Sequence, residues 1–162
     1  MPQRLDVNFE AGERTRVEWA CVKLVYEFGR LMDAREYDAL VELFAEDAEF
    51  NRPSEPKKIL RGRNQLLADF KARPSNQVTT HLFSNVQVTA RTGSHATGFS
   101  YLIMYTGTTE NVGPVGVPFA NREARIGAFT EEFVCRNGMW LFQRRSGRML
   151  LVVGGQTCDG HA

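Results

Sequence analysis

Two side chains far apart in this sequence are the best candidates for acid/base chemistry. Asp33 ends a long segment of helical apolar pattern, and His81 lies in a strand-like run at residues 79–85. A carboxylate beside an imidazole holds the ring in one tautomer and stabilises its protonated form. Such a histidine can take a proton from a carbon next to a carbonyl, or from a hydroxyl, and general-base help of this kind contributes roughly 10²–10⁴-fold to a rate. The chemistry requires a fold that brings the two side chains together.

Each of the two residues also has an ordinary structural interpretation. Strand alternation places His81 on the face that carries Phe83 and Asn85, where a histidine can be a hydrogen-bonded core residue. Asp33 precedes Glu36 by three residues, which is the spacing of a capping box at the start of a second helix. On the local pattern alone the structural interpretation is the better one for both residues.

Hydrogen-bond donors are needed nearby to stabilise a developing oxyanion. The sequence offers Tyr37, Asn85, Ser100 and Tyr101 for this role. Alternation puts Ser100 and Tyr101 on opposite faces of their strand, so at most one of that pair faces the site.

A second carboxylate and several aromatic residues complete the candidate site. Glu131 shares a strand face with Phe129, while Glu132 takes the other face, which makes Glu131 the second candidate acid. Ordinary core packing is the alternative for every aromatic residue. The side chains expected to line an apolar pocket are Phe50, Phe70, Phe83, Phe129 and Trp140.

Composition excludes several classes of protein. The chain has 162 residues, of which 43% are hydrophobic, enough for one compact domain with a substantial core. A net charge of +1 gives no electrostatic case for binding nucleic acid or an acidic membrane surface. No apolar run is long enough to span a bilayer, and the first residues have no apolar signal core, so a cytoplasmic protein is expected.

Cysteine and histidine usage predicts no metal site and no cofactor. The three cysteines form no Cys-x-x-Cys pair, which disfavours both disulfides and zinc. Only three histidines exist, and His161 lies in the tail. No glycine loop suited to cradling phosphate is present.

The elements that must position the candidate residues change character halfway along the chain. Helical patterns come first and strands with turn signals follow, which predicts an α+β fold, with N-terminal helices packed in the concave face of a strongly curved antiparallel sheet. We expect a single domain over residues 1–162, with a loose arm at 1–12 and a tail at 154–162. The predicted helices are 13–32, 37–44 and 62–73, and the predicted strands are 47–50, 78–90, 95–106, 121–135 and 139–145, the last continuing to 153 past a kink at Gly147.

The segment 111–119 fits this pattern poorly. It is apolar yet rich in glycine and proline, so it cannot form a helix. A connection of this length is either a lid or partner contact, or a surface loop packed on the domain.

Four stretches in order resemble the SnoaL-like family of the nuclear-transport-factor-2-like superfamily, over roughly residues 13–150. No single stretch is specific, but the ordered set is. The stretches are Asp33-x-x-x-Tyr37-Asp38-x-Leu40 continuing to Asp47-Ala48, then Gly62-Arg63-x-x-Leu66, then Thr80-His81-Leu82-x-Ser84-Asn85, and finally Gly127-x-Phe129-x-Glu131 with Asn137-Gly138-x-Trp140-x-Phe142-x-x-Arg145.

The resemblance implies a cystatin-like α+β cone with Asp33 and His81 as an acid/base pair inside it. Similar proteins include scytalone dehydratase, ketosteroid isomerases, polyketide cyclases and small subunits of ring-hydroxylating dioxygenases, so the fold does not decide the activity. The chain departs from the dehydratase pattern: the strand that should carry a second pocket histidine has only His95, at its start, and Phe129 stands where a tyrosine is expected.

Two functions follow as expectations. The first is a cofactor-free lyase or isomerase that acts on a hydrophobic cyclic or aromatic carbonyl compound. The second is a non-catalytic ligand-binding or scaffold domain similar to an oxygenase small subunit. A homodimer or higher homo-oligomer is also expected, because one sheet face would be left uncovered and apolar. The residues placed on that face are Leu82, Val86 and Val88, with Leu102 or Met104.

Overall fold

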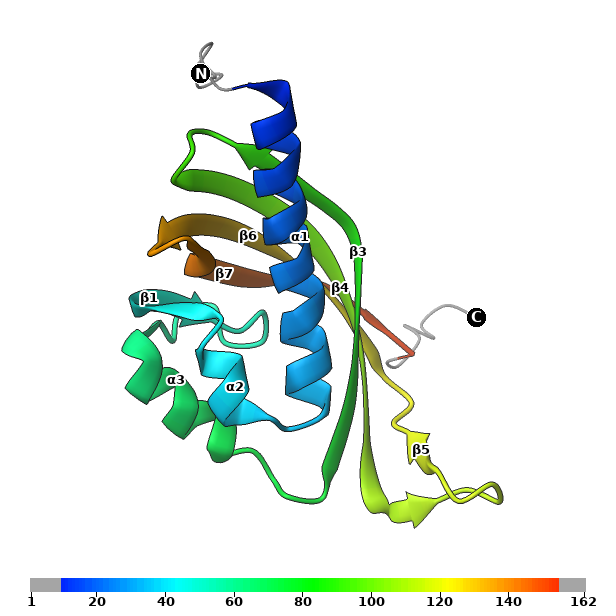
Figure 1. Ribbon diagram of the computed structural model, residues 1–162. Helices are drawn as coiled ribbons and strands as arrows, with labels where there is room; N and C mark the ends of the chain where they lie inside the picture. The colour runs from blue at the N-terminus through cyan, green and yellow to red at the C-terminus, as the bar shows by residue number, and fades with distance from the viewer. Residues whose placement is uncertain (1–9, 155–162) are drawn as a thin grey trace.

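Three helices and one sheet make up the described part of the chain (Figure 1). The structure is a computed structural model that describes residues 10–154. The predicted C-terminal tail lies outside that range except for Gly154. The elements in chain order are α1 (Ala11–Asp33), α2 (Tyr37–Val41), β1 (Phe44–Asn51), β2 (Leu60–Arg61), α3 (Gly62–Lys71), β3 (Gln77–Ala90), β4 (His95–Val112), β5 (Pro118–Ala120), β6 (Ala124–Arg136) and β7 (Met139–Val153).

Helix α1 lies along the concave face of the sheet because its apolar residues recur at helical spacing. The buried stripe includes Val17, Cys21, Val25 and Phe28. The helix begins at Ala11, so the prediction of a loose arm through residue 12 is wrong at its end; residues 1–9 lie outside the described range.

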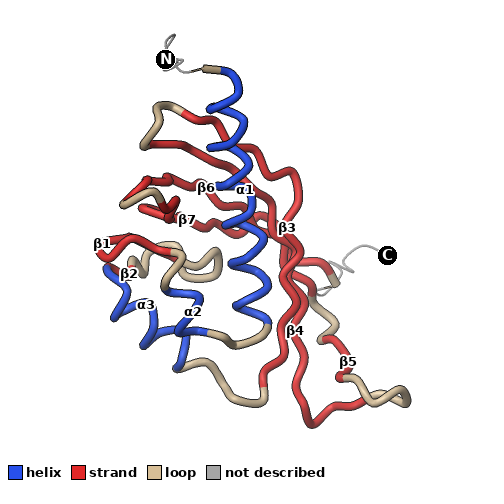
Figure 2. Tube along the Cα trace, viewed as in Figure 1, coloured by secondary structure: helices blue, strands red, loops and turns tan. Residues whose placement is uncertain are grey.

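The sheet has seven strands in the order β2-β1-β7-β6-β4-β3, and β5 pairs with β4 (Figure 2). The expected four-strand meander is present as β3, β4, β6 and β7, all joined antiparallel. The α+β class is confirmed. The sheet is mixed rather than purely antiparallel, however, because β1 runs parallel to β7, with Phe44 opposite Phe142. Local pattern gave no signal for this pairing between distant segments.

Several boundaries differ from those predicted. The second helix ends at Val41, and Phe44 begins strand β1 because the carbonyl of Leu43 accepts a hydrogen bond from the amide of Phe142 at 2.8 Å. Segment 111–119 comprises the end of β4, a turn and the start of β5, which together form a hairpin. A 2.8 Å hydrogen bond from the amide of Gly113 to the carbonyl of Val117 closes the turn.

Two irregularities change which side chains face inward. On β3 the register shifts between Ser84 and Gln87, and Asn85 adopts a positive φ of 49°. The shift turns Val86 and Val88 toward the core, so the prediction that they lie on the outer face is wrong. Leu102 and Met104 also face inward and line a pocket.

On β7 the register with β6 shifts between Glu132 and Phe133. Both Phe142 and Arg145, three residues apart, are therefore buried, which strict alternation does not allow. Among residues 10–154, no helix is both long and apolar enough to cross a membrane.

Candidate functional site

The end of α1 and the middle of β3 bring Asp33 and His81 into direct contact. Oδ1 of Asp33 lies within hydrogen-bond distance of Nδ1 of His81. Oδ2 accepts a hydrogen bond from the backbone amide of His81 at 2.8 Å, and Oδ1 also accepts one from the hydroxyl of Thr79 at 3.1 Å. The carboxylate is thus held by two strand residues that share a face.

These contacts determine the tautomer of the imidazole. An ionised carboxylate only accepts hydrogen bonds, so Nδ1 of His81 carries the proton and Nε2 carries the free electron pair. The side chain of His81 is 5% exposed, yet its ring borders a pocket. The alternative interpretation of Asp33 as a helix cap is wrong, because α2 begins after Glu36 with no side-chain capping bond.

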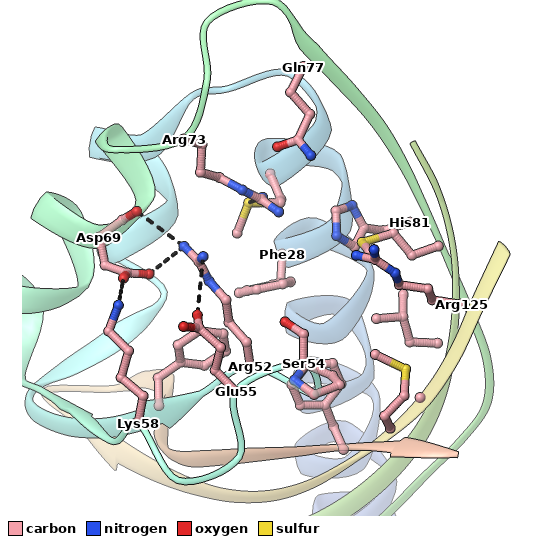
Figure 3. A pocket seen from close by; sticks show the side chains of 18 of the residues that line it. Phe28, Arg52, Ser54, Glu55, Lys58, Asp69, Arg73, Gln77, His81 and Arg125 are labelled. Carbon is pink, nitrogen blue, oxygen red and sulfur yellow. Dashed lines mark hydrogen bonds and ion pairs between the residues drawn. The ribbon is translucent and has the colours of Figure 1, made fainter. Parts of the chain in front are cut away.

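The pocket beside His81 has a volume of about 400 Å³ and lies between the helices and the concave face of the sheet (Figure 3). This volume falls within the range of small-molecule sites. The large apolar side chains of its wall come from α1, β1, β4, β6 and β7 and are Phe28, Met32, Phe50, Leu102, Met104, Phe129 and Met149.

Sheet register places a cation in the same row as the histidine. His81 on β3 lies opposite Met104 on β4, and Met104 lies opposite Arg125 on β6. The three side chains line the pocket together, and Figure 3 shows His81 and Arg125 on the same side of the cavity. Within residues 10–154, Arg125 has no side-chain hydrogen bond or ion pair.

The opposite wall carries a network of charges. Arg52 pairs with Asp69 and lies 3.8 Å from Glu55, and Lys58 donates to Asp69 at 2.7 Å. Both carboxylates of the pocket wall are therefore already engaged by cations. Arg73 is also part of the wall.

Two of the predicted aromatic residues line the pocket and three residues lie behind its wall. Phe50 and Phe129 line it. Phe70 and Tyr37 are buried against each other with ring centroids 6.2 Å apart, and Phe83 packs against Phe129 at 6.2 Å. These three support the site as core residues rather than by facing the cavity.

Three predicted site residues lie elsewhere. Asn85 is exposed because the bulge in β3 turns it out of the inner face. Tyr101 is on the outer face, edge-on to Phe99 with centroids 4.9 Å apart, while its neighbour Leu102 lines the pocket. Trp140 borders a separate groove along α1. The prediction that these three residues contribute to the pocket is wrong.

Glu131 faces inward but does not line the pocket, and it is paired with an arginine. It accepts a 2.8 Å hydrogen bond from Ser100, and Nη2 of Arg145 lies 3.6 Å from its Oε1. Burial raises the pKa of Glu131, and Arg145 opposes that shift. Burial also lowers the pKa of Arg145 to about 10.

Aromatic rings surround the buried guanidinium. The side chain of Arg145 is 0% exposed, and its guanidinium carbon lies 4.0 Å from the ring centroid of Phe28 and 4.3 Å from that of Phe129. Phe83 and Phe142 complete the cage, each at 4.8 Å. The cation is therefore stabilised by ring faces and by Glu131.

The basic side chains of the site were not among the residues predicted from the sequence. The inward position of Arg125 could have been predicted, because the alternation that turns Phe129 and Glu131 inward also turns Arg125 inward. Arg145 was hidden by the register shift, and Arg73 follows a helix where no strand pattern applies. Within residues 10–154, no group of three His, Cys, Asp or Glu side chains could hold a metal ion.

Comparison with known families confirms the resemblance in the sequence. A model of the SnoaL-like domain matches residues 13–146, which is most of the chain. The chain belongs to the SnoaL-like family. A comparison with curated proteins gave no match.

Solved structures with the fold of this SnoaL-like protein share little of its sequence. A putative scytalone dehydratase from Novosphingobium aromaticivorans DSM 12444 has a TM-score of 0.69 and 19% identity, over 88% of this chain and 93% of that one. A type 2 hexachlorocyclohexane dehydrochlorinase (LinA) has a TM-score of 0.74 and 17% identity, over 94% and 97%. An NTF2-like protein with a cystatin-like fold, from N. aromaticivorans, has a TM-score of 0.63 and 21% identity, over 91% and 84%. At these identities the likeness shows a shared fold.

Proposed function

We propose that this SnoaL-like protein is a cofactor-free lyase or isomerase in which Asp33 and His81 act as an acid/base pair. One observation carries the proposal. The carboxylate holds Nδ1 of His81, while the imidazole borders a pocket large enough for a small molecule. A core histidine has no need of a charged partner and an adjoining cavity.

The proposed reaction begins with proton abstraction. Nε2 of His81 takes a proton from a carbon next to a carbonyl, and Asp33 stabilises the imidazolium that forms. Negative charge then develops on the carbonyl oxygen. Arg125 lies in the same row of the sheet and is the group placed to stabilise that charge. The imidazolium next returns its proton, to a leaving group in a lyase or to another carbon in an isomerase.

The wall of the pocket favours a ring-shaped substrate. Phe28, Phe50 and Phe129 present aromatic surface from three different elements. Flat apolar surface of this kind suits a cyclic or aromatic carbonyl compound. Two of the similar structures are named a dehydratase and a dehydrochlorinase, and both names denote loss of a small molecule from a substrate. They support the lyase branch of the proposal.

The test uses exchange of a carbon-bound proton with solvent, which requires no knowledge of the natural substrate. Cyclic ketones and β-hydroxyketones are incubated with the protein in D₂O, and deuterium incorporation next to the carbonyl is followed by NMR. Wild-type protein should accelerate exchange for at least one compound, and His81→Ala should abolish the acceleration. His95→Ala is the matched control, because His95 is exposed at the start of β4. Equal exchange with wild type and His81→Ala would sink the proposal.

The second candidate is a ligand-binding or scaffold domain. It is favoured by the apolar outer face of the sheet, which exposes Val78, Leu82 and Tyr105. We propose that this face pairs with a second copy of the chain, because exposed apolar patches of this kind mark interfaces. Pairing of copies is compatible with either function, so the exchange experiment decides between them.

A further inference from the structure

Arg73 is a basic side chain of the pocket wall that the proposed proton transfer does not use. It follows the C-terminal end of α3, and Figure 3 shows its guanidinium pointing into the cavity beneath Gln77. Its only side-chain hydrogen bond within residues 10–154 runs from Nη1 to the sulfur of Met32 at 2.7 Å. A thioether is a weak acceptor, so most of the donor capacity of this guanidinium is unused.

The positive charge of Arg73 is also poorly balanced. Burial lowers its pKa, and so does the nearby guanidinium of Arg52. The positive charge of Arg35 lowers the pKa of Arg73 further. Asp69 is the acidic neighbour that attracts Arg73, but its carboxylate is already bound by Arg52 and Lys58. Like charges packed together and partly removed from water are costly unless an anion joins them.

The side chain of Arg35 holds the loop that carries Arg73 in place. Nη1 of Arg35 donates to the carbonyls of Pro74 at 3.0 Å and Gln77 at 3.2 Å, and its Nη2 donates to the carbonyl of Arg73 at 3.2 Å. Arg35 itself sits at a positive φ of 59°, just after α1. The position of Arg73 is thus preorganised by the backbone that follows Asp33, and a bound ligand would not have to order the loop.

We propose that Arg73 binds an oxyanion substituent of the substrate, a carboxylate or a phosphate, with the side-chain amide of Gln77 beside it. This inference rests on the proposed function and narrows its substrate class to anionic cyclic carbonyl compounds. The ring of the substrate lies against the aromatic wall, the anion faces Arg73, and the carbon that loses its proton faces His81. A guanidinium matches both oxyanions through paired N–H donors, so the geometry supports either one.

The experiment measures binding of three probes by isothermal titration calorimetry. The probes are 1-naphthoate, 1-naphthyl phosphate and neutral 1-naphthamide, which share one ring system. An anionic probe should bind wild type roughly tenfold or more tightly than the amide, since a charge-assisted hydrogen bond contributes more than a neutral one. The preferred anion identifies the substituent as carboxylate or phosphate.

Variants assign the effect to Arg73. Arg73→Gln should remove the preference for the anion while leaving affinity for 1-naphthamide unchanged, and Arg73→Lys should keep part of the preference. Arg136→Gln is the charge-matched control, because Arg136 is exposed near the β6–β7 turn, away from the pocket. Equal binding of amide and anions, equal loss for all probes in Arg73→Gln, or no binding of any probe at millimolar concentration would each overturn the inference.

The same measurements separate this inference from the proposed function. His81→Ala should keep the preference for the anionic probes over 1-naphthamide, whatever it does to the affinity for the shared ring, because the imidazole takes no part in holding the anion. Anion preference that depends on Arg73, in a protein that never exchanges carbon-bound protons, would leave the anion site standing and remove the catalytic proposal. Proton exchange that depends on His81, without any preference for an anion, would leave the catalytic proposal standing and remove the anion site.

Discussion

Asp33 holds His81 at two points, with one oxygen on the ring nitrogen Nδ1 and the other on the backbone amide at 2.8 Å. The second contact anchors the carboxylate to the strand itself, so rotation of the histidine ring does not release it. This two-point contact fixes the end of α1 against the middle of β3. A substitution at Asp33 can therefore affect the catalytic rate, through the ring contact, and the stability of the fold, through the backbone contact, to different extents.

Asp33→Asn should reduce the rate of any reaction found by roughly 10²-fold or more while the melting temperature changes little. Asparagine keeps an oxygen that can accept from the backbone amide of His81, which preserves the anchor. Its amide nitrogen, however, donates to Nδ1 and moves the ring proton to Nε2, so the base is lost. Single-turnover kinetics measures the rate, and thermal melting measures the melting temperature. A silent Asp33→Asn would end the acid/base hypothesis.

Thr79→Val should lower the rate without removing the pair. The hydroxyl of Thr79 donates to Oδ1 of Asp33 at 3.1 Å, and valine has nearly the same shape. Loss of one hydrogen bond worth about 1 kcal/mol corresponds to roughly fivefold in rate. Thr80→Val is the control, because Thr80 is exposed on the other face of β3. Equal effects of the two changes would show that Thr79 does not position the carboxylate.

Arg145→Ala should destabilise the fold by about 3–5 kcal/mol, because it leaves Glu131 buried without its cation and opens a cavity among four aromatic rings. Urea unfolding gives the free energy of unfolding directly. The double variant Arg145→Met with Glu131→Leu should recover most of the loss, since apolar groups of similar volume replace the pair. A loss below about 1 kcal/mol for the single variant would show that the ion pair contributes little.

Glu131→Gln should change how stability depends on pH. Burial raises the pKa of Glu131 above its usual value of 4.5. At a pH between these two pKa values, the carboxyl group keeps its proton in the folded protein but has released it in the unfolded chain. The free energy of unfolding contributed by this group therefore falls as pH rises from about 4.5 through the raised pKa. Subtracting the Glu131→Gln curve from the wild-type curve isolates this term. Parallel curves between pH 4 and 8 would contradict the shift.

Leu82→Glu should shift the protein toward a single-chain mass in light scattering at micromolar concentration. Leu82 is 50% exposed on the outer face of β3, and a carboxylate there would be buried at an interface between copies. Asn64→Glu is the matched control, because Asn64 is exposed on α3 and not on the outer face of the sheet. A single-chain mass for wild type would contradict the proposed pairing.

The amino-acid sequence alone determined the class of fold, most elements and the two central residues of the site. Helical spacing in α1 and period-two alternation in β4 and β6 are local signals, set by which face of each element is buried. The ordered motifs then indicated the family, and the resemblance to that family predicted the pairing of Asp33 with His81. These inferences depend on neighbours in sequence or on the order of motifs along the chain, and neither requires coordinates.

Tertiary structure alone decided what surrounds the pair. A bulge at Asn85 and a register shift between Phe142 and Arg144 each reverse the side that later residues face, and one extra residue leaves no mark in the hydrophobic pattern. Arg73 reaches the pocket from a loop, and Arg125 shares a pocket with His81 only because β4 pairs with both of their strands. The charge of the cavity thus depends on long-range pairing, which no local period encodes.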